Sequence, residues 1–82
     1  MAQMSDRQRT YLERLHRSFE WKFPSHSHSV REFIIGNQAT YDMAKARLER
    51  VLLNGDSVQA SAVIGWAKYC PVKAIRELAA MR

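Results

Sequence analysis

The spacing of apolar residues constrains the fold of this 82-residue chain more than any other feature of its sequence. The clearest stripe follows the 3.6-residue period of an α-helix and consists of Tyr41, Ala44, Leu48, Val51 and Leu52. Helical spacing recurs in other segments, whereas no two β-rich runs are available to pair with each other. We therefore predict an all-α protein, a compact bundle of four to five short helices in a single domain over residues 1–82. We expect residues 1–4 to be flexible.

The first helix is predicted from a capping box. Ser5 is followed three residues later by Gln8, so the hydroxyl can accept from a backbone amide while the Gln side chain reaches back. Behind this cap, apolar side chains recur at helical spacing: Tyr11, Leu12, Leu15 and Phe19. We expect about four turns of helix, ending before Pro24 because the residue before a proline disfavours helical geometry.

The middle of the chain leaves alternatives open. Ser29 follows a polar loop and repeats the capping pattern, which predicts a short helix over residues 30–35. The same region could instead form a strand through 31–35. In a third alternative, the short helix continues across Gly36 into the clear helix over 40–53.

Turn residues divide the C-terminal half of the chain. We expect Gly55 to adopt the left-handed conformation of a C′ residue after the helix over 40–53. Asp56 or Ser57 can cap the next helix, and Pro71 suits the first position of the last one, with Cys70 outside it. We expect these two helices to span residues 57–69 and 71–81.

The sequence argues against catalysis and against a bound cofactor. Cys70 is the only cysteine, and we expect it to fill a turn or cap a helix and not to act as a nucleophile. The carboxylates are interspersed with Lys and Arg, as on solvated helix faces, and no glycine-rich phosphate loop is present. His26 and His28 alone cannot supply the four ligands of a structural metal site. We predict a protein that is not an enzyme and holds no metal.

The sequence also bears on location. The first residues contain no continuous apolar segment of the kind that a secretory signal requires, and the longest apolar runs are too short to span a bilayer. A single thiol without a partner fits a reducing compartment. We therefore expect a cytoplasmic protein with no membrane role.

The distribution of charge indicates an anionic partner. The chain has 13 Lys and Arg against 8 Asp and Glu, a formal net charge of +5. Residues 57–82 are the most one-sidedly basic part, with four Lys or Arg against Glu77 alone. Such an excess favours association with nucleic acid or with an acidic protein.

The C-terminal αα-hairpin can be compared position by position with a known DNA-binding motif. Ile64 falls at an apolar position and Gly65 at a position where a small residue lets two helices cross, while three further buried positions hold Cys70, Ile75 and Leu78. Two positions depart from the pattern, since Lys68 replaces an apolar residue and Tyr69 replaces the usual Gly. With these residues the hairpin resembles the helix-turn-helix family over about 20 residues. The resemblance implies that the last helix enters the major groove of DNA.

We therefore predict a small DNA-binding regulator that uses its C-terminal helix pair. Lys73 and Arg76 would face the groove, and further contacts to phosphates would come from Lys68, Arg82, Arg7, Arg14 and Arg17.

The alternative is a protein-interaction module, because any αα-hairpin with a short turn shows similar spacings. In size and composition the chain resembles small basic helical proteins of phages and mobile elements, which act as adaptors or inhibitors. Such a module would dock on a larger acidic protein through exposed aromatic anchors, for which we select Trp21, Phe23 and Tyr69. The small core also makes a homodimer a reasonable expectation.

Overall fold

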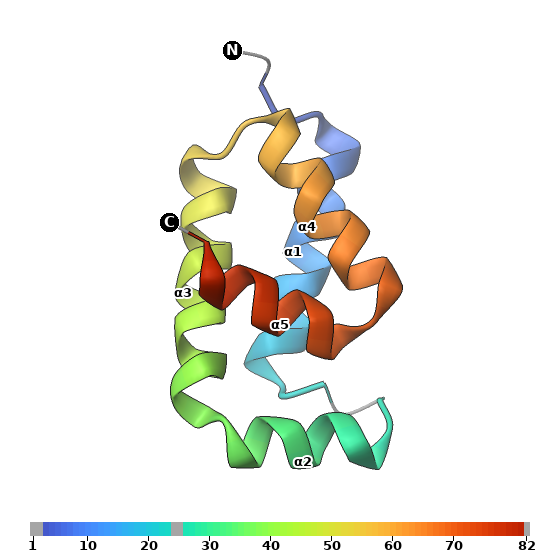
Figure 1. Ribbon diagram of the computed structural model, residues 1–82. Coiled ribbons are helices and arrows are strands. Elements are labelled where there is room, and N and C mark those ends of the chain that lie inside the picture. Colours follow the sequence, from blue (N-terminus) through green and yellow to red (C-terminus); the bar gives the residue numbers. More distant parts are fainter. Residues whose placement is uncertain (1–2, 24–25, 82) are drawn as a thin grey trace.

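The computed structural model describes residues 3–23 and 26–81. It contains five helices (Figure 1), which are α1 (Asp6–Glu20), α2 (His28–Gly36), α3 (Gln38–Asn54), α4 (Ser57–Tyr69) and α5 (Pro71–Ala80). The predicted all-α bundle is confirmed, and the described residues form no strand beyond one isolated bridge between Gln3 and Asp56. None of the described helices has the length and apolar character of a membrane span.

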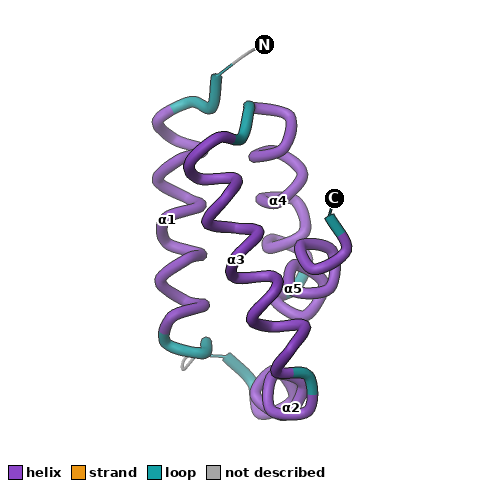
Figure 2. The backbone as a smooth tube through the Cα atoms, turned by 90° about the vertical axis from the view of Figure 1, so that its left-hand side faces the viewer, coloured by secondary structure: helices purple, strands orange, loops and turns teal. Residues whose placement is uncertain are grey.

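The helices pack around a small shared core. α1, α3 and α4 run along the long axis of the molecule, α2 lies across one end, and α5 packs against α3 and α4 (Figure 1). α1 contacts the same two helices, and Figure 2 shows α1 and α5 on opposite sides of α3. The largest fully buried side chains come from every helix: Phe19, Leu12, Ile34, Leu48, Ile75, Leu78 and Val63.

The N-terminal caps of α1 and α4 are those that the sequence predicts. Ser5 caps α1 with a complete capping box, in which the Gln8 amide donates to Ser5 Oγ at 3.1 Å and the Ser5 amide donates to Gln8 Oε1 at 3.0 Å. Asp56 caps α4 by accepting from the Gln59 amide at 2.9 Å. The first residues of the described chain are also engaged, since Met4 packs against the core. Residues 1 and 2 lie outside the described part.

The start of α2 corrects the prediction. The helix begins at His28, earlier than expected, with Ser27 as N-cap and without a side-chain capping bond, so the capping box at Ser29 is wrong. Ser29 Oγ lies 3.0 Å from Ser27 Oγ, and Glu32 pairs with His28 at 2.8 Å, so both expected partners are engaged elsewhere. The alternative strand through 31–35 is also wrong.

α2 and α3 are two separate helices. The chain leaves helical geometry at Asn37, whose φ is −138° and ψ is 48°. The Asn37 side chain donates to the carbonyl of Phe33 at 2.9 Å and thereby satisfies a carbonyl at the end of α2. The fused helix is therefore excluded, and the direction of the chain changes sharply between α2 and α3 (Figure 1).

The glycine after α3 is required for space and not for handedness. Gly55 has a φ of −75°, so the predicted left-handed conformation is wrong. A Cβ atom at this position would lie 2.5 Å from the Val51 carbonyl oxygen and 2.8 Å from Val51 Cγ1. The turn from α3 into α4 is therefore too tight for any side chain.

The left-handed conformations lie at the end of α1, which stops at Glu20, well before Pro24. The Lys22 amide donates to the Phe19 carbonyl at 3.2 Å and the Phe23 amide donates to the Ser18 carbonyl at 2.8 Å, which is the bonding pattern of a Schellman motif. Lys22 occupies the C′ position with a φ of 56°, and Phe23 follows with a φ of 51°. Glycine usually occupies such a position because it has no Cβ penalty there.

We expect Lys22→Gly to stabilise the protein by about 1 kcal/mol, since it removes the penalty for a left-handed non-glycine residue. Urea unfolding followed by circular dichroism measures the effect. Lys22→Ala is the matched control, because it removes the same charge and keeps the Cβ atom. Equal stability of the two variants would contradict this account.

Gly55 precedes α4 and Gly65 lies within it. We expect alanine at these two positions to change the stability of the protein in opposite directions. Gly55→Ala should destabilise the protein by about 1–3 kcal/mol because it forces the turn apart. Gly65 is in open space, with no atom within 4 Å of an added Cβ, so Gly65→Ala should stabilise by about 0.5–1 kcal/mol through helix propensity. Thermal unfolding of both variants measures these changes. A loss of stability in Gly65→Ala would contradict the prediction for that position.

Candidate nucleic-acid interface

The first group of predicted basic residues lies along α1 and the end of α4. Arg7 and Arg14 are two helical turns apart, about 10 Å along the axis, so they share one face of α1. Between them lies Tyr11, and the Lys68 ammonium of α4 lies 5.9 Å from the centre of its ring. This cation–π contact joins the basic face of α1 to the C-terminal end of α4.

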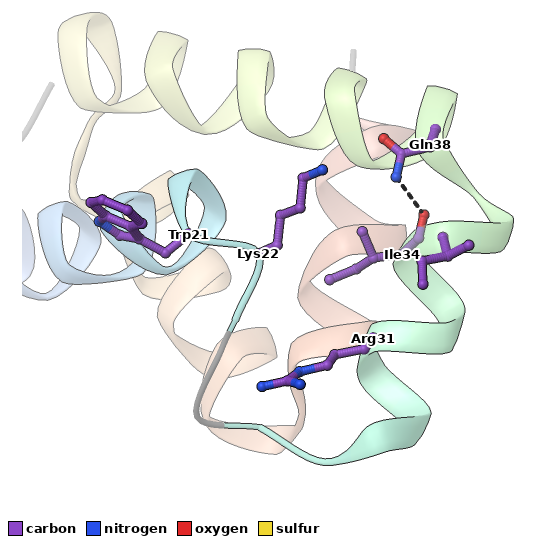
Figure 3. A pocket seen from close by; sticks show the side chains of 6 residues that line it. Trp21, Lys22, Arg31, Ile34 and Gln38 are labelled. Atoms are coloured by element: carbon purple, nitrogen blue, oxygen red, sulfur yellow. Dashed lines mark hydrogen bonds between the residues drawn. The ribbon is translucent and has the colours of Figure 1, made fainter.

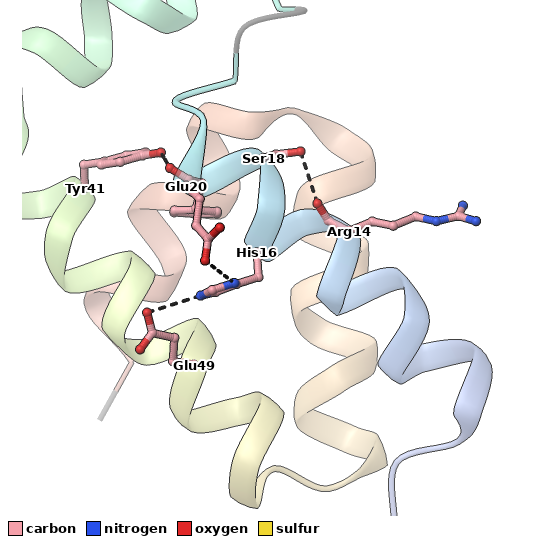
Figure 4. A network of polar contacts seen from close by, with 7 residues as sticks. Arg14, His16, Ser18, Glu20, Tyr41 and Glu49 are labelled. Atoms are coloured by element: carbon pink, nitrogen blue, oxygen red, sulfur yellow. Dashed lines mark hydrogen bonds and ion pairs between the residues drawn. The ribbon is translucent and has the colours of Figure 1, made fainter.

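A hollow of about 240 Å³ extends this group to the turn between α4 and α5. Its lining residues come from α1, from the segment before α2 and from the turn, and include Tyr11, Arg14, His26, Ala67 and Pro71. Figure 4 shows the Arg14 side chain extending away from the bundle. An anion placed in this hollow would therefore meet the guanidinium without displacing another partner.

The second group lies on α5, on the other side of the same turn. Lys73, Arg76 and Tyr69 line an open hollow of about 310 Å³ together with Glu77. The Lys73 ammonium lies 3.7 Å from a Glu77 carboxylate oxygen, and the Arg76 guanidinium lies 5.2 Å from the centre of the Phe33 ring on α2. Tyr69 is 79% exposed beside them.

The structure thus divides the predicted set. Arg14 and Lys68 border the α4–α5 turn from one side, and Lys73 and Arg76 border it from the other. Three predicted contacts do not join this surface: Arg7 lies farther along α1, Arg17 is exposed near the end of α1, and Arg82 lies outside the described residues.

Unpaired positive charge distinguishes this surface. Among the described residues of the two groups, only Lys73 has a carboxylate within salt-bridge distance. Several carboxylates pair with histidines elsewhere, since His16 lies 3.5 Å from Glu20 and 3.2 Å from Glu49, and His28 pairs with Glu32. Arg14, Lys68 and Arg76 therefore remain available to an external anion.

The α4–α5 turn is short and well capped. Cys70 Sγ accepts from the Lys73 amide at 3.3 Å and so caps α5, while Pro71 occupies its first turn, as expected from the sequence. The expected crossing at Gly65 is wrong, because no atom of another helix approaches its Cβ position within 4 Å. α5 instead packs its buried residues, Ala74, Ile75 and Leu78, against α3 and α4.

The predicted aromatic anchors have different environments. Trp21 is 71% exposed and Tyr69 is 79% exposed, so both rings are accessible. Phe23 is only 2% exposed and packs edge-on against Phe19, with ring centres 5.1 Å apart. The prediction of Phe23 as a surface anchor is wrong, because the left-handed turn at the end of α1 directs its ring into the core.

Sequence reasoning missed a further surface feature. Ile35 is 73% exposed and lines a hollow with Trp21, Lys22 and Arg31. The sequence does indicate an exposed isoleucine here, because a helix cannot bury both members of the adjacent pair Ile34-Ile35 on a single face. No group of three potential metal ligands occurs within 3–23 and 26–81.

Comparison with family models, with curated proteins and with solved structures yields no match to this chain.

Polar contacts fix the basic helix α1 against α3. The Tyr41 hydroxyl donates to the Phe19 carbonyl, and the two rings stack with centres 5.2 Å apart (Figure 4). Arg9 donates to the Leu52 carbonyl at 2.9 Å. Burial, and to a lesser extent the charge of Asp42, raises the pKa of Tyr41 from 10.0 to about 12.

The raised pKa predicts a pH-dependent role for Tyr41. The folded protein retains the phenolic proton at pH values where the unfolded chain has lost it, so this stabilisation is present below pH 10 and is lost as the pH rises to about 12. We expect Tyr41→Phe to cost about 1 kcal/mol at neutral pH, because the phenylalanine ring cannot donate the hydrogen bond. The difference in unfolding free energy between the variant and the wild type should shrink above pH 10. Urea unfolding at neutral pH and above pH 10 measures this change. A difference that does not change with pH would contradict the assignment.

Proposed function

We propose that this protein binds DNA through the basic surface around the α4–α5 turn. The observation that supports the proposal best is the grouping of Arg14, Lys68, Lys73 and Arg76 around one turn with a single carboxylate partner among them. Contacts from Lys and Arg to phosphates supply most of the affinity of DNA-binding proteins.

The dimensions and exposure of α5 suit this role. An α-helix with its side chains is about 10–12 Å in diameter, which fits the major groove of about 12 Å, and the ten residues of α5 extend about 15 Å along it. Its inner face is fixed in the core by Ala74, Ile75 and Leu78, so the outer face with Lys73 and Arg76 is presented on a rigid element. A rigid helix enters a groove without the cost of ordering its backbone on binding.

Tyr69 adds a second kind of contact. Its ring is exposed beside Lys73 and Arg76 and can pack against a sugar or an unstacked base. We therefore expect Tyr69 to contribute to the affinity for single strands more than to the affinity for duplex DNA.

The experiment is a fluorescence anisotropy titration with a labelled duplex of about two helical turns, at about 50 and about 200 mM salt. Affinity should fall steeply with salt. The double variant Lys73→Ala/Arg76→Ala should bind more weakly, and its log–log salt slope should be shallower by about 0.9 for each phosphate that the variant no longer neutralises.

Lys45→Ala/Arg50→Ala is the matched control. It also removes one lysine and one arginine, but from α3, on the opposite side of the molecule from the α4–α5 turn (Figure 1). It should retain most of the wild-type affinity. Absence of binding at low salt, or an equal reduction of affinity in the two double variants, would eliminate the proposed interface.

A further inference from the structure

A second surface lies at the C-terminal end of α1, and it shares no lining residue with the two hollows at the α4–α5 turn. It is a hollow of about 230 Å³ between the end of α1, the helix α2 and the start of α3, lined by Trp21, Lys22, Arg31, Ile34, Ile35 and Gln38 (Figure 3). We propose that this hollow docks an acidic segment of a partner protein through apolar side chains of that segment.

The walls of the hollow explain the apolar part of the proposal. Trp21 and Ile35 are 71% and 73% exposed, although both are among the residue types that gain most from burial. They line opposite ends of the hollow, with Lys22 between Trp21 and Ile34 (Figure 3), and Ile34 is itself held in the core. A partner segment lying along the hollow would remove both apolar surfaces from water.

Hydrogen bonds hold the backbone around the hollow in place. Trp21 ends α1 and its amide donates to the Arg17 carbonyl at 3.1 Å. Gln38 donates from Nε2 to the Ile34 carbonyl at 3.3 Å, which ties the start of α3 to α2 (Figure 3). Little ordering of the backbone is therefore needed around the hollow, which lowers the cost of binding.

The charges of the lining residues favour an acidic partner. Two of the six lining residues, Lys22 and Arg31, are cationic, and none of the six is acidic. Basic side chains beside an exposed indole favour carboxylates flanking an aromatic or aliphatic anchor, and they disfavour a basic segment. The formal net charge of +5 attracts such a segment over longer distances as well.

The backbone at Lys22 provides independent support. Lys22 stands at a left-handed position that glycine would occupy with less strain, and its side chain extends from there into the hollow (Figure 3). Strained non-glycine residues are concentrated at functional sites. A lysine at this position sacrifices stability and adds a positive charge at the rim.

The test is selection of random short peptides displayed on phage against the full-length protein, followed by anisotropy titration of the enriched peptides. We expect enriched sequences to combine Asp or Glu with Trp, Phe or Leu. Trp21→Ala should weaken their binding at least about tenfold, as for an aromatic hot spot. Lys22→Gly should weaken binding while it raises the unfolding temperature, so that a loss of affinity cannot be ascribed to misfolding.

Tyr69→Ala is the control, because it removes an equally exposed aromatic ring from the other surface. It should leave peptide binding unchanged, and Trp21→Ala should leave duplex binding unchanged. The proposal is overturned if no selected peptide depends on Trp21, if the selected peptides lack acidic residues, or if Trp21→Ala abolishes duplex binding, which would assign this hollow to nucleic acid.

Discussion

The burial of one face of α3 is the constraint on which the rest of the molecule depends. α1, α2 and α5 all pack against this helix, and α4 is held in turn by α1 and α5. Tyr41, Ala44, Leu48 and Val51 are the side chains enclosed in this way. Each large apolar side chain contributes on the order of 1.5–3 kcal/mol when fully buried, and a chain of this size has few of them to lose. α1 and α5 both pack against α3, and in the view of Figure 2 they lie on either side of it.

Sequence predicts this fold well where the decisive interaction is local. The caps at Ser5 and Asp56 and the start of α5 at Pro71 each involve residues within three or four positions of each other. Their chemistry can be read from spacing alone. The stripe on α3 is similarly legible, because helical periodicity determines which side chains share a face.

The sequence predictions are wrong where the path of the backbone determines which atoms surround a residue. The sequence predicts that Gly55 is needed for its conformational freedom, whereas it is needed because Val51 lies too close for a side chain. The sequence places Phe23 at the surface, whereas the turn at Lys22 carries it beneath the end of α1. In both cases the deciding contact comes from the way the backbone turns back on the preceding helix, which composition and periodicity do not report.

The candidate interface shows the same division. The basic residues of α5 can be identified because charge is visible in sequence, but their grouping with Arg14 across the α4–α5 turn depends on how α1 packs against α4. The hollow beside Trp21 cannot be predicted in this way, because it is created by α2 lying across the end of α1 (Figure 3). Two surfaces of different character thus occupy different sides of a very small protein. One carries four basic residues and an exposed tyrosine, and the other carries exposed Trp21 and Ile35 beside two basic residues.

The sulfur cap of α5 has a practical consequence for labelling and crystallisation work. Cys70 Sγ accepts a hydrogen bond from the Lys73 amide. The sulfur atom that labelling reagents modify is therefore part of the N-terminal cap of α5. Serine would preserve an acceptor in nearly the same place, whereas alanine would leave that amide without one. A maleimide or iodoacetamide adduct would add bulk at the joint between two helices, so spectroscopic probes are better introduced at an engineered site, with the native thiol exchanged for a hydroxyl.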